Sequence, residues 1–403
     1  MAEPPYNGLV RLLHLQLSDF RNFARLDLEL PPGLSIFIGE NAQGKTNLLE
    51  AVYMLSAVRA PHAASELQLV RREAALDEGA AARVAGQIET LGGPLKMEVA
   101  VMGRPGNSGQ VAAKSVRVNG IARRSWEAAG AFMAVLFTVR DLDLITGSPS
   151  VRRRYLDGAL GRLDSAYAAA RQRYEKVLLQ RNHLLKRIRE GVAQRRELEF
   201  WDDELAKHGG YLFWSRARHL EALQTRAADA HAALGGGEML ALHYLPRLDT
   251  GQEALASPEE ASAALASELE STLTRQLGAG FTTVGPHRDD IDFTLNGVAA
   301  ADFGSRAQQR TAALALRLAE AHYLRDARGE PPVMLLDDIF SELDQSRRGR
   351  VMASLSGFEQ VLLTTTELGR VPVEVCGPAR LFAVRDGSVE ALETEPTAGI
   401  SET

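Results

Sequence analysis

The apolar and polar positions near the start of the chain predict a strand, a loop and a helix in that order. Residues 34–38 form an apolar run of the kind that fills a buried strand. The stretch G-E-N-A-Q-G-K-T follows, and Leu48, Val52 and Leu55 then recur at helical spacing. We therefore expect a glycine-rich loop between a buried strand and a helix over 47–58.

Alternating patterns predict further strands on both sides of this segment. Two short strands are expected at 14–17 and 26–30, joined by the turn S-D-F-R-N-F. Residues 80–125 alternate as a run of antiparallel strands, in which Asn119-Gly120 is typical of a tight hairpin turn. The apolar run 132–139 predicts one more strand.

The middle of the chain changes to helical periodicity. Apolar residues three, four or seven positions apart continue from Leu156 to Ile188, which predicts one long helix with a single apolar face. Two or three further helices are expected up to about residue 275. Glycines at Gly209-Gly210 and at 235–237 predict interruptions in this helical stretch.

The final third returns to mixed helix and strand. A second hairpin is expected at Asn296-Gly297, and the last dozen residues are predicted to be a disordered tail. The remaining expected elements are a helix over 305–327, a buried strand over 333–336, a helix over 347–355 and a strand over 360–365.

Composition is that of an ordinary soluble globular protein. The 403 residues are 45% hydrophobic and 24% charged, which excludes a collagen-like or largely disordered chain. Cys376 is the single cysteine, so no internal disulfide can form and a reducing compartment is favoured. No apolar run is long enough to span a bilayer. We therefore expect a cytoplasmic protein without membrane contact. The net charge of -6 neither indicates nor excludes nucleic-acid binding.

The glycine-rich loop matches the pattern G-x-x-x-x-G-K-[ST], which cradles polyphosphate in P-loop proteins. Its backbone N–H groups and the following helix N-terminus would surround the phosphates of ATP. We expect Lys45 to reach the β- and γ-phosphates and the Thr46 hydroxyl to bind Mg²⁺. The candidate nucleotide-binding residues are Gly39, Glu40, Asn41, Ala42, Gln43, Gly44, Lys45, Thr46 and Asn47.

An acidic partner for the metal is expected at V-M-L-L-D-D, where a buried strand ends in two carboxylates. Asp337 would contact Mg²⁺, and Asp338 would orient or deprotonate the attacking water. The alternative is a turn that caps the strand. Because 292 positions separate Lys45 from Asp337, the nucleotide-binding core must be split by an insertion, which we place at about 151–280.

The segment F-G-S-R-A-Q-Q-R-T precedes the acidic pair and admits two interpretations. Ser305 and Gln308 have the spacing of a capping box that satisfies free helix N–H groups. The same serine at a helix N-terminus would also suit the signature loop of an ABC-type ATPase, which contacts nucleotide. The stretch I-F-S-E-L-D, ending at Asp344, would then be the adjoining D-loop.

Together these motifs resemble the RecF family of SMC/ABC-type ATPases. The matching stretches are L-S-D-F-R-N-F, G-E-N-A-Q-G-K-T-N-L-L-E-A, D-L-D-L-I-T-G-S-P-S-V-R-R-R-Y-L-D, V-G-P-H-R-D-D, G-S-R-A-Q-Q-R-T and L-L-D-D-I-F-S-E-L-D. The resemblance implies an α/β ABC-type P-loop ATPase head, similar to the Rad50 head, that is split in sequence by a helical lobe. The expected domains are an N-terminal half (1–150), a helical lobe (151–280), a C-terminal half (281–390) and a tail (391–403).

The resemblance also implies a function in DNA repair and replication. It implies ATP and Mg²⁺ as ligands, ATP-dependent homodimerisation, weak DNA-stimulated ATP hydrolysis, and binding at gap junctions between duplex and single-stranded DNA. The implied partners are RecR and RecO, with which the family promotes RecA loading. Carried onto this sequence, Lys45 and Asp338 are catalytic, Thr46 and Asp337 bind the metal, and Ser305 contacts the nucleotide of the other subunit.

Several positions depart from the family pattern. Ala42 stands where the P-loop usually has glycine, and we expect an ordinary backbone conformation to tolerate it. Ala307 replaces a glycine of the signature loop, and Val139-Arg140 replaces a Pro-Glu pair. Thr364 and its neighbours stand where ABC transporters have a switch histidine. Ala307, together with an aspartate at the catalytic position Asp338, keeps an alternative open: a DNA-binding module that ATP stabilises and that does not turn over.

Basic residues on the helical stretch are candidates for DNA contact. Arg152, Arg153 and Arg154 lie at an expected helix start, and Arg181, Lys186 and Arg187 follow on the long helix. The alternative is a solvated helix face.

Two other classes of protein fit the sequence less well. A chromosome-structuring ATPase would need far longer heptad segments. A transporter subunit would have a switch histidine, which this sequence lacks.

Overall fold

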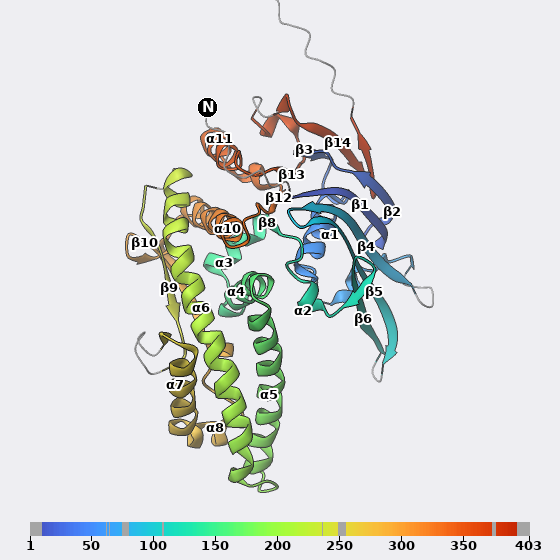
Figure 1. Cartoon of the computed structure of the whole chain (residues 1–403). Helices are drawn as coiled ribbons and strands as arrows, with labels where there is room; N and C mark the ends of the chain where they lie inside the picture. Colours follow the sequence, from blue (N-terminus) through green and yellow to red (C-terminus); the bar gives the residue numbers. More distant parts are fainter. Residues whose placement is uncertain are drawn as a thin grey trace, which may run out of the picture. The chain divides into compact units, whose positions relative to one another are not determined.

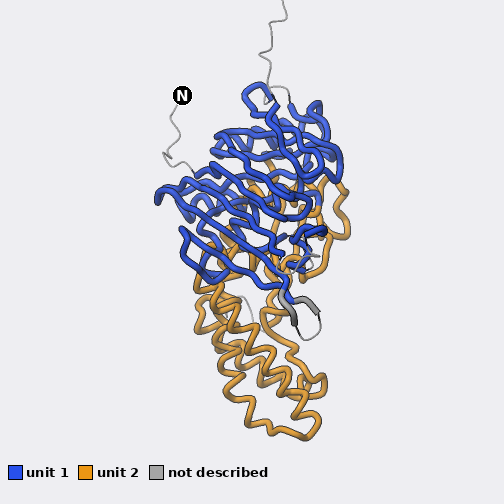
Figure 2. The backbone as a smooth tube through the Cα atoms, turned by 90° about the vertical axis from the view of Figure 1, so that its right-hand side faces the viewer, with its two compact units in different colours: residues 1–139, 233–235, 320–403 blue, residues 140–232, 236–319 orange. Residues whose placement is uncertain are grey.

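The computed structural model describes residues 10–61, 63, 65–74, 80–106, 109–235, 237–248, 255–372 and 376–392. The chain forms two compact units, coloured separately in Figure 2. Unit 1 comprises residues 1–139, 233–235 and 320–403, and unit 2 comprises residues 140–232 and 236–319. Residues 140–150 and 281–319 thus group with the helical segment. The predicted division into functional domains is not tested by this grouping and stays a prediction, and most of the predicted tail lies outside the described residues.

Unit 1 contains a six-stranded sheet that is antiparallel throughout, in the order β2-β1-β4-β5-β6-β7. This sheet confirms the two short strands and the antiparallel run predicted near the start of the chain. Asn119 and Gly120 both have positive φ at the predicted hairpin turn. The strands are β1 (Arg11–Phe20), β2 (Phe23–Glu29), β4 (Ala81–Thr90), β5 (Gly93–Gly106), β6 (Gly109–Val118) and β7 (Ile121–Arg123).

The second sheet of unit 1 has the order β15-β14-β3-β13-β12-β8 and is parallel except for β15. It confirms all four predicted buried strands, whereas β14 and β15 have no counterpart in the sequence-based prediction. The parallel strands end at one edge of the sheet, so the residues that follow β3 and β12 come together there. The strands are β3 (Gly33–Ile38), β8 (Ala134–Thr138), β12 (Val333–Asp337), β13 (Gln360–Thr365), β14 (Arg380–Arg385) and β15 (Ser388–Ala391).

Helix α1 (Lys45–Ala57) packs between the two sheets of unit 1 (Figure 1). It contacts strands of both sheets, and most of its side chains are buried. Gly86 of β4 makes room for the helix, because a Cβ there would lie 2.6 Å from Leu55 Cδ1. The other helical segments are η1 (Glu66–Leu69), α2 (Ser125–Ala128), η7 (Ile339–Glu342), α11 (Gln345–Ser354), η8 (Leu368–Arg370) and η3 (Val139–Asp141), which crosses into unit 2.

Unit 2 is mainly helical, with one small three-stranded sheet in the order β11-β10-β9. The hairpin formed by β10 and β11 confirms the turn predicted at Asn296-Gly297. Among the described residues, no helix is both long and apolar enough to cross a membrane. The elements are α3 (Leu142–Thr146), α4 (Pro149–Leu163), α5 (Ser165–Arg189), η4 (Arg195–Leu198), α6 (Glu199–Ala233), β9 (Leu240–Leu245), α7 (Pro258–Ser271), α8 (Leu273–Ala279), η6 (Pro286–Arg288), β10 (Asp290–Leu295), β11 (Val298–Ala299), α9 (Ala300–Phe303) and α10 (Arg306–Arg328), which continues into unit 1.

The single long helix predicted from Leu156 to Ile188 is two helices, α4 and α5. Asp164 has an extended backbone between them, with φ -126° and ψ 107°. Its carboxylate accepts the N–H of Ala166 at 2.8 Å and so caps α5. The apolar spacing continues across the break, which is why periodicity alone indicates one helix.

Helix α6 continues through Gly209-Gly210, where an interruption was predicted. Both glycines face α7: a Cβ on Gly209 would lie 2.5 Å from Leu265 Cδ2, and one on Gly210 would lie 2.4 Å from the backbone N of Ser262. The glycines therefore permit close packing of two helices, and α6 ends instead at Ala233.

We expect Gly210→Ala to destabilise unit 2 by about 1–3 kcal/mol, because the added methyl group meets backbone that cannot rotate away. Gly349→Ala in α11 is the matched control, since no atom lies within 4 Å of its Cβ position. There the change should stabilise by up to about 1 kcal/mol through helix propensity. Urea unfolding of both variants measures the difference, and equal unfolding free energies would contradict the proposed packing role.

Candidate nucleotide-binding site

The P-loop lies between β3 and α1, and two of its residues adopt left-handed conformations. Gly44 caps α1 with φ 115°, and Ala42 has φ 67°. A left-handed conformation costs an L-residue roughly 1–2 kcal/mol, whereas glycine adopts it freely. The expectation of an ordinary backbone at Ala42 is therefore wrong, and this departure from the family pattern places an alanine where glycine is favoured.

Thr46 and Asp337 are in hydrogen-bond contact although 291 positions separate them. The Thr46 hydroxyl oxygen lies 2.8 Å and 3.0 Å from the two carboxylate oxygens of Asp337. Thr364, at the end of the intervening strand β13, donates its hydroxyl to Asp337 Oδ1 at 2.9 Å. The structure thus brings together both predicted metal-binding residues and adds Thr364, whose position at a strand end was the only sequence signal for this role.

The Lys45 ammonium contacts the backbone of its own P-loop. Its Nζ donates to the backbone oxygens of Gly39 and Glu40, each at 2.7 Å, and the residue is 7% exposed. Burial lowers the pKa of Lys45, and the charges of Asp338 and Asp337 oppose that shift. The ammonium is therefore already placed among carbonyl and carboxylate oxygens.

Asp338 is held in a constrained conformation next to this group. Its φ is 48°, and its N–H donates to Thr364 Oγ1 at 3.0 Å. Its Oδ1 is buried and has no hydrogen-bond partner within the described part of the chain. A buried acceptor without a donor typically costs 1–3 kcal/mol, so this oxygen is suited to a donor that the protein does not supply.

Two further residues that the sequence analysis did not single out brace the P-loop. Asn22, in the turn after β1, donates to the backbone oxygen of Gln43 at 3.0 Å and accepts from Asn47 at 2.8 Å. A Cβ on Gly44 would lie 2.7 Å from the Asn22 amide nitrogen. On the other side, Gln43 Oε1 accepts the backbone N–H of Asp386 at 2.7 Å.

Among the described residues there is no cluster of three or more histidine, cysteine, aspartate or glutamate side chains that could hold a metal ion. The donor set at Thr46 and Asp337 is instead one hydroxyl and one carboxylate. Mg²⁺ in nucleotide sites commonly takes one or two such protein ligands and completes its octahedron with phosphate oxygens and water. The residues present therefore fit Mg²⁺ that arrives with a nucleotide.

The residues predicted for the signature loop form the capping box. The backbone N–H of Ser305 donates to Gln308 Oε1 at 2.7 Å, and the Gln308 N–H lies 3.3 Å from Ser305 Oγ. Gln308 also donates to Glu238 at 2.5 Å. Asp344 caps α11 by accepting the Arg347 N–H at 2.8 Å, a bond that lowers the pKa of Asp344. The nucleotide-contact role of these residues stays a prediction.

Two of the six predicted DNA-contacting residues are buried in structural contacts. Arg152 pairs with Asp290 at 2.6 Å and is 8% exposed. Arg181 is fully buried and pairs with Asp202 at 2.5 Å. These arginines hold unit 2 together and are withdrawn as DNA contacts, because a phosphate cannot reach them.

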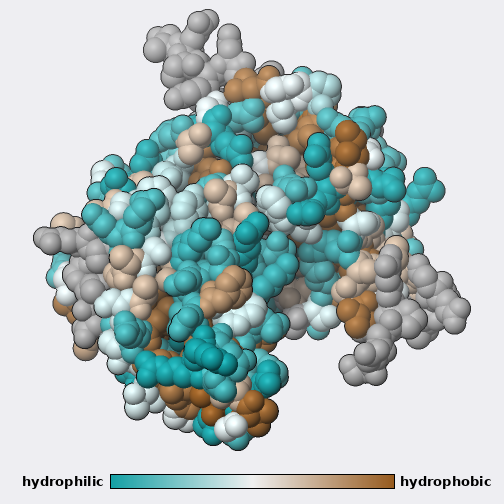
Figure 3. Space-filling view, turned by 60° about the horizontal axis from the view of Figure 1, so that its bottom comes forward, coloured by the Kyte–Doolittle hydropathy of each residue, from teal (hydrophilic) through white to brown (hydrophobic). Residues whose placement is uncertain are grey.

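The other four basic residues keep at least partial exposure. Arg153 is half-buried, and Arg154, Lys186 and Arg187 are exposed. The end of unit 2 that comes forward in Figure 3 is largely hydrophilic, with a few apolar side chains among the polar ones. The alternative of a solvated helix face therefore stays open for Lys186 and Arg187.

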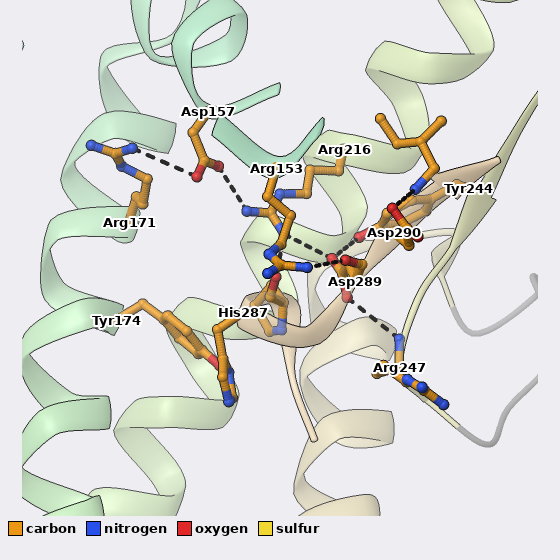
Figure 4. Close-up of polar contacts among 12 residues, drawn as sticks. Arg153, Asp157, Arg171, Tyr174, Arg216, Tyr244, Arg247, His287, Asp289 and Asp290 are labelled. Carbon is orange, nitrogen blue, oxygen red and sulfur yellow. Dashed lines mark hydrogen bonds and ion pairs between the residues drawn. The ribbon is translucent and has the colours of Figure 1, made fainter. Parts of the chain in front are cut away.

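A buried cluster of charged and tyrosine side chains lies inside unit 2 (Figure 4). Arg216 is 3% exposed and donates to Asp289 and to Asp157, each at 2.7 Å. Tyr167 donates to Asp157 at 2.6 Å, and Tyr244 donates to Asp289 at 2.5 Å. Burial alone would raise the pKa of Asp157, but Arg216 and Arg171 lower it.

His287 is buried beside this cluster and is held neutral. Tyr174 donates its hydroxyl to His287 Nδ1 at 2.7 Å, so Nε2 carries the hydrogen and faces the Thr282 carbonyl at 3.2 Å. Burial is the main cause that lowers the pKa of His287 to about 4, and the nearby arginines add to it.

The parallel sheet, the P-loop before α1 and the acidic pair after β12 define a P-loop ATPase head of the ABC type. A family model described as "RecF/RecN/SMC N terminal domain" matches residues 11–373. The head domain of an Smc protein bound to ScpA has the same fold, with a TM-score of 0.52, 15% identity, and coverage of 96% of this chain and 97% of that one.

Closer similarity is to proteins named DNA replication and repair protein RecF. That of Chloroflexus aurantiacus is 41% identical, covering 94% of this chain and 99% of its own length. That of Moorella thermoacetica is 38% identical, covering 96% and 98%. A solved structure of the recombination mediator protein RecF-ATP in the RecFOR pathway has a TM-score of 0.83 and 32% identity, covering 95% and 98%. The chain belongs to the RecF family.

We expect the stability of unit 2 to fall as the pH drops from about 6.5 towards about 4, because the unfolded chain protonates His287 more readily than the folded one. The full effect is about 3 kcal/mol, and it is absent above the unfolded pKa. The control is His287→Gln, which offers an acceptor and a donor without titrating. Urea unfolding between pH 4.5 and 7.5 should show a smaller decline for the variant; parallel curves would contradict the assignment.

Proposed function

We propose that this protein is an ATP-dependent DNA-binding recombination mediator that hydrolyses ATP slowly. The observation that carries the proposal is the contact of Thr46 with Asp337, because a hydroxyl and a carboxylate next to a P-loop are ligands suited to a nucleotide-bound Mg²⁺. The solved relative described as RecF-ATP supports ATP as the nucleotide.

In this proposal the P-loop surrounds the phosphates with backbone N–H groups from Gly39 to Asn47, at the N-terminus of α1. Lys45 exchanges its bonds to the Gly39 and Glu40 carbonyls for phosphate oxygens. Mg²⁺ held by Thr46 and Asp337 would supply charge neutralisation to the phosphates. Thr364 orients the Asp337 carboxylate by donating to Oδ1.

Asp338 is the proposed catalytic carboxylate. Its buried Oδ1 has no donor among the described residues, so it can accept a hydrogen bond from the attacking water and take its proton. An aspartate side chain is one methylene shorter than glutamate, and a misplacement of about 1 Å can cost on the order of 10²-fold in rate. Slow turnover suits a switch whose ATP-bound state must persist until DNA contact stimulates hydrolysis.

A homodimer that forms on ATP completes the proposed cycle. Ser305, Gln308 and Asp344 are then contributed to the nucleotide of the other subunit. The capping box leaves the start of α10 ordered, with Ser305 exposed, which supports such a role. Ala307 stands at the position where the family has glycine, and it would limit how closely the phosphate approaches.

The family implies the remaining features of the proposal. The DNA substrate is a junction of duplex and single strand at a gap, and the partners are RecR and RecO, with RecA loading as the outcome. The recombination-mediator description of the solved relative in the RecFOR pathway supports this assignment. A protein that acts on chromosomal DNA works in the cytoplasm, which is where we place it.

We expect steady-state ATP turnover that gapped duplex DNA stimulates. Lys45→Met should reduce it by roughly 10²–10³-fold, because a cation that stabilises the transferring phosphoryl group is lost. Phosphate release with and without gapped DNA measures both effects. If the wild-type protein binds ATP and never turns it over on any DNA, the alternative holds, and the chain is a DNA-binding module that ATP stabilises.

Mg-ATP should also convert the Asp338→Asn variant into a species of twice the 43.8 kDa chain mass, because the intact sandwich cannot hydrolyse its nucleotide. Light scattering measures the mass directly. The control is the double variant with Lys45→Met, which should show no increase when Mg-ATP is added. An unchanged mass for Asp338→Asn would refute ATP-dependent dimerisation.

A further inference from the structure

Unit 2 contains a hollow of about 900 Å³ that belongs to none of the sites described above. Its lining comes from the start of α4, the segment after β9, the α7–α8 region and the loop before β10. The charged side chains of the lining are Arg153, Arg247, Arg275, Arg288 and Glu268. Four positive charges therefore face one negative charge, in a chain whose net charge is -6.

Arg247, Arg275 and Arg288 lack the carboxylate partners that other arginines of unit 2 have, whereas the charges of Asp289, Asp290 and Asp157 act on Arg153. Arg275 donates to Thr283 Oγ1 at a long 3.3 Å, and the Arg288 guanidinium lies 5.1 Å above the ring of Phe281. In the part of the chain that the structure describes, no ion pair with a carboxylate forms at any of the four. The charge of Arg247, Arg275 and Arg288 is therefore available to an anion in the hollow.

The buried cluster of Figure 4 contacts two of the arginines that line the hollow and holds them in place. The backbone oxygen of Asp289 accepts from Arg153 at 2.5 Å, and its carboxylate lies 3.4 Å from the backbone N of Arg247. Asp289 is itself fixed by Arg216 and is fully buried. Two of the arginines thus stand on a rigid base, which reduces the entropy lost when a ligand binds.

The chemistry of the hollow selects the class of ligand. Arginine fits phosphate groups, and the N-terminus of α4 adds positive potential at Ser148 and Ser150. Phe281 is 41% exposed, and single-strand-binding proteins combine a positive groove with aromatic rings on which bases stack. An acidic peptide would match the arginines but leave Phe281 without a role.

We propose that this hollow binds a single strand of DNA, with the arginines on its phosphates and a base against Phe281. A volume of about 900 Å³ is near the upper end for drug-sized ligands. The inference rests on the DNA-binding part of the proposed function and assigns that binding to a defined surface of unit 2.

The test is fluorescence anisotropy of a labelled 20-nucleotide oligo-dT with the full chain and Mg-ATP, over a series of salt concentrations. Arg275→Ala with Arg288→Ala should weaken binding at least tenfold and reduce the salt slope by about 1.4, or about 0.7 for each lost phosphate contact. Phe281→Ala should weaken binding roughly five- to hundredfold with an unchanged slope. The matched control is Arg196→Ala with Arg218→Ala, two exposed arginines of unit 2 outside the hollow.

The outcomes separate this inference from the proposed function. If the wild type binds the oligonucleotide and the hollow variants bind it with the same affinity and slope, the site assignment is wrong and the proposed function stands. If the wild type binds gapped duplex DNA but not the oligonucleotide, only this inference fails; if it binds neither, even at low salt, both fail. If the hollow variants lose binding of a poly-glutamate peptide and keep that of DNA, the occupant is an acidic protein segment and the proposal is overturned. Circular dichroism of each variant establishes that the fold is retained.

Discussion

The hydrogen bonds at the Asp337 carboxylate depend on one constraint, the placement of β13 between β3 and β12 in a parallel sheet. Parallel neighbours need long crossovers, so this sheet can join segments from near the start and near the end of the chain. The register sets Ile38 beside Thr365 and Asp337 beside Thr364. Once these strands pair, the P-loop and the acidic pair reach the same edge, and no separate interaction is needed to bring them together.

The sequence contained enough information for the elements that carry this arrangement. Apolar runs predicted the four buried strands, and the two Asn-Gly pairs predicted hairpins that the structure confirms. The backbone conformation within the P-loop could not be predicted. An alanine at position 42 looks the same in the sequence whether its conformation is ordinary or left-handed, so Ala42 gave no indication of its positive φ. The continuous course of α6 through Gly209-Gly210 depends on the approach of α7, which is distant in sequence. Local patterns do not report such tertiary contacts.

The arginines of unit 2 show the same limit for charge. Arg152 and Arg181 look like surface residues in the sequence, yet each is buried against a carboxylate from a distant segment. Arg216 is also buried in ion pairs with carboxylates. Removing one partner of such a buried pair typically lowers the free energy of unfolding by about 3–5 kcal/mol. The arginines around the hollow form no ion pair with a carboxylate of the described residues, and they differ from these only by their tertiary surroundings. Charge that stabilises the fold and charge that is free for a ligand are therefore distinguished by structure alone.

The strand order also has a consequence for synthesis of the chain. Strand β3 carries the P-loop, and its two neighbours in the sheet, β13 and β14, lie after residue 359. The contact of Gln43 with Asp386 comes later still. During translation, which adds roughly 5–20 residues per second, β3 and its loop must wait for nearly the whole polypeptide before they can pair. A nascent chain that ends before residue 360 therefore lacks both strands that flank β3, and one that ends before Asp386 lacks the contact that holds Gln43.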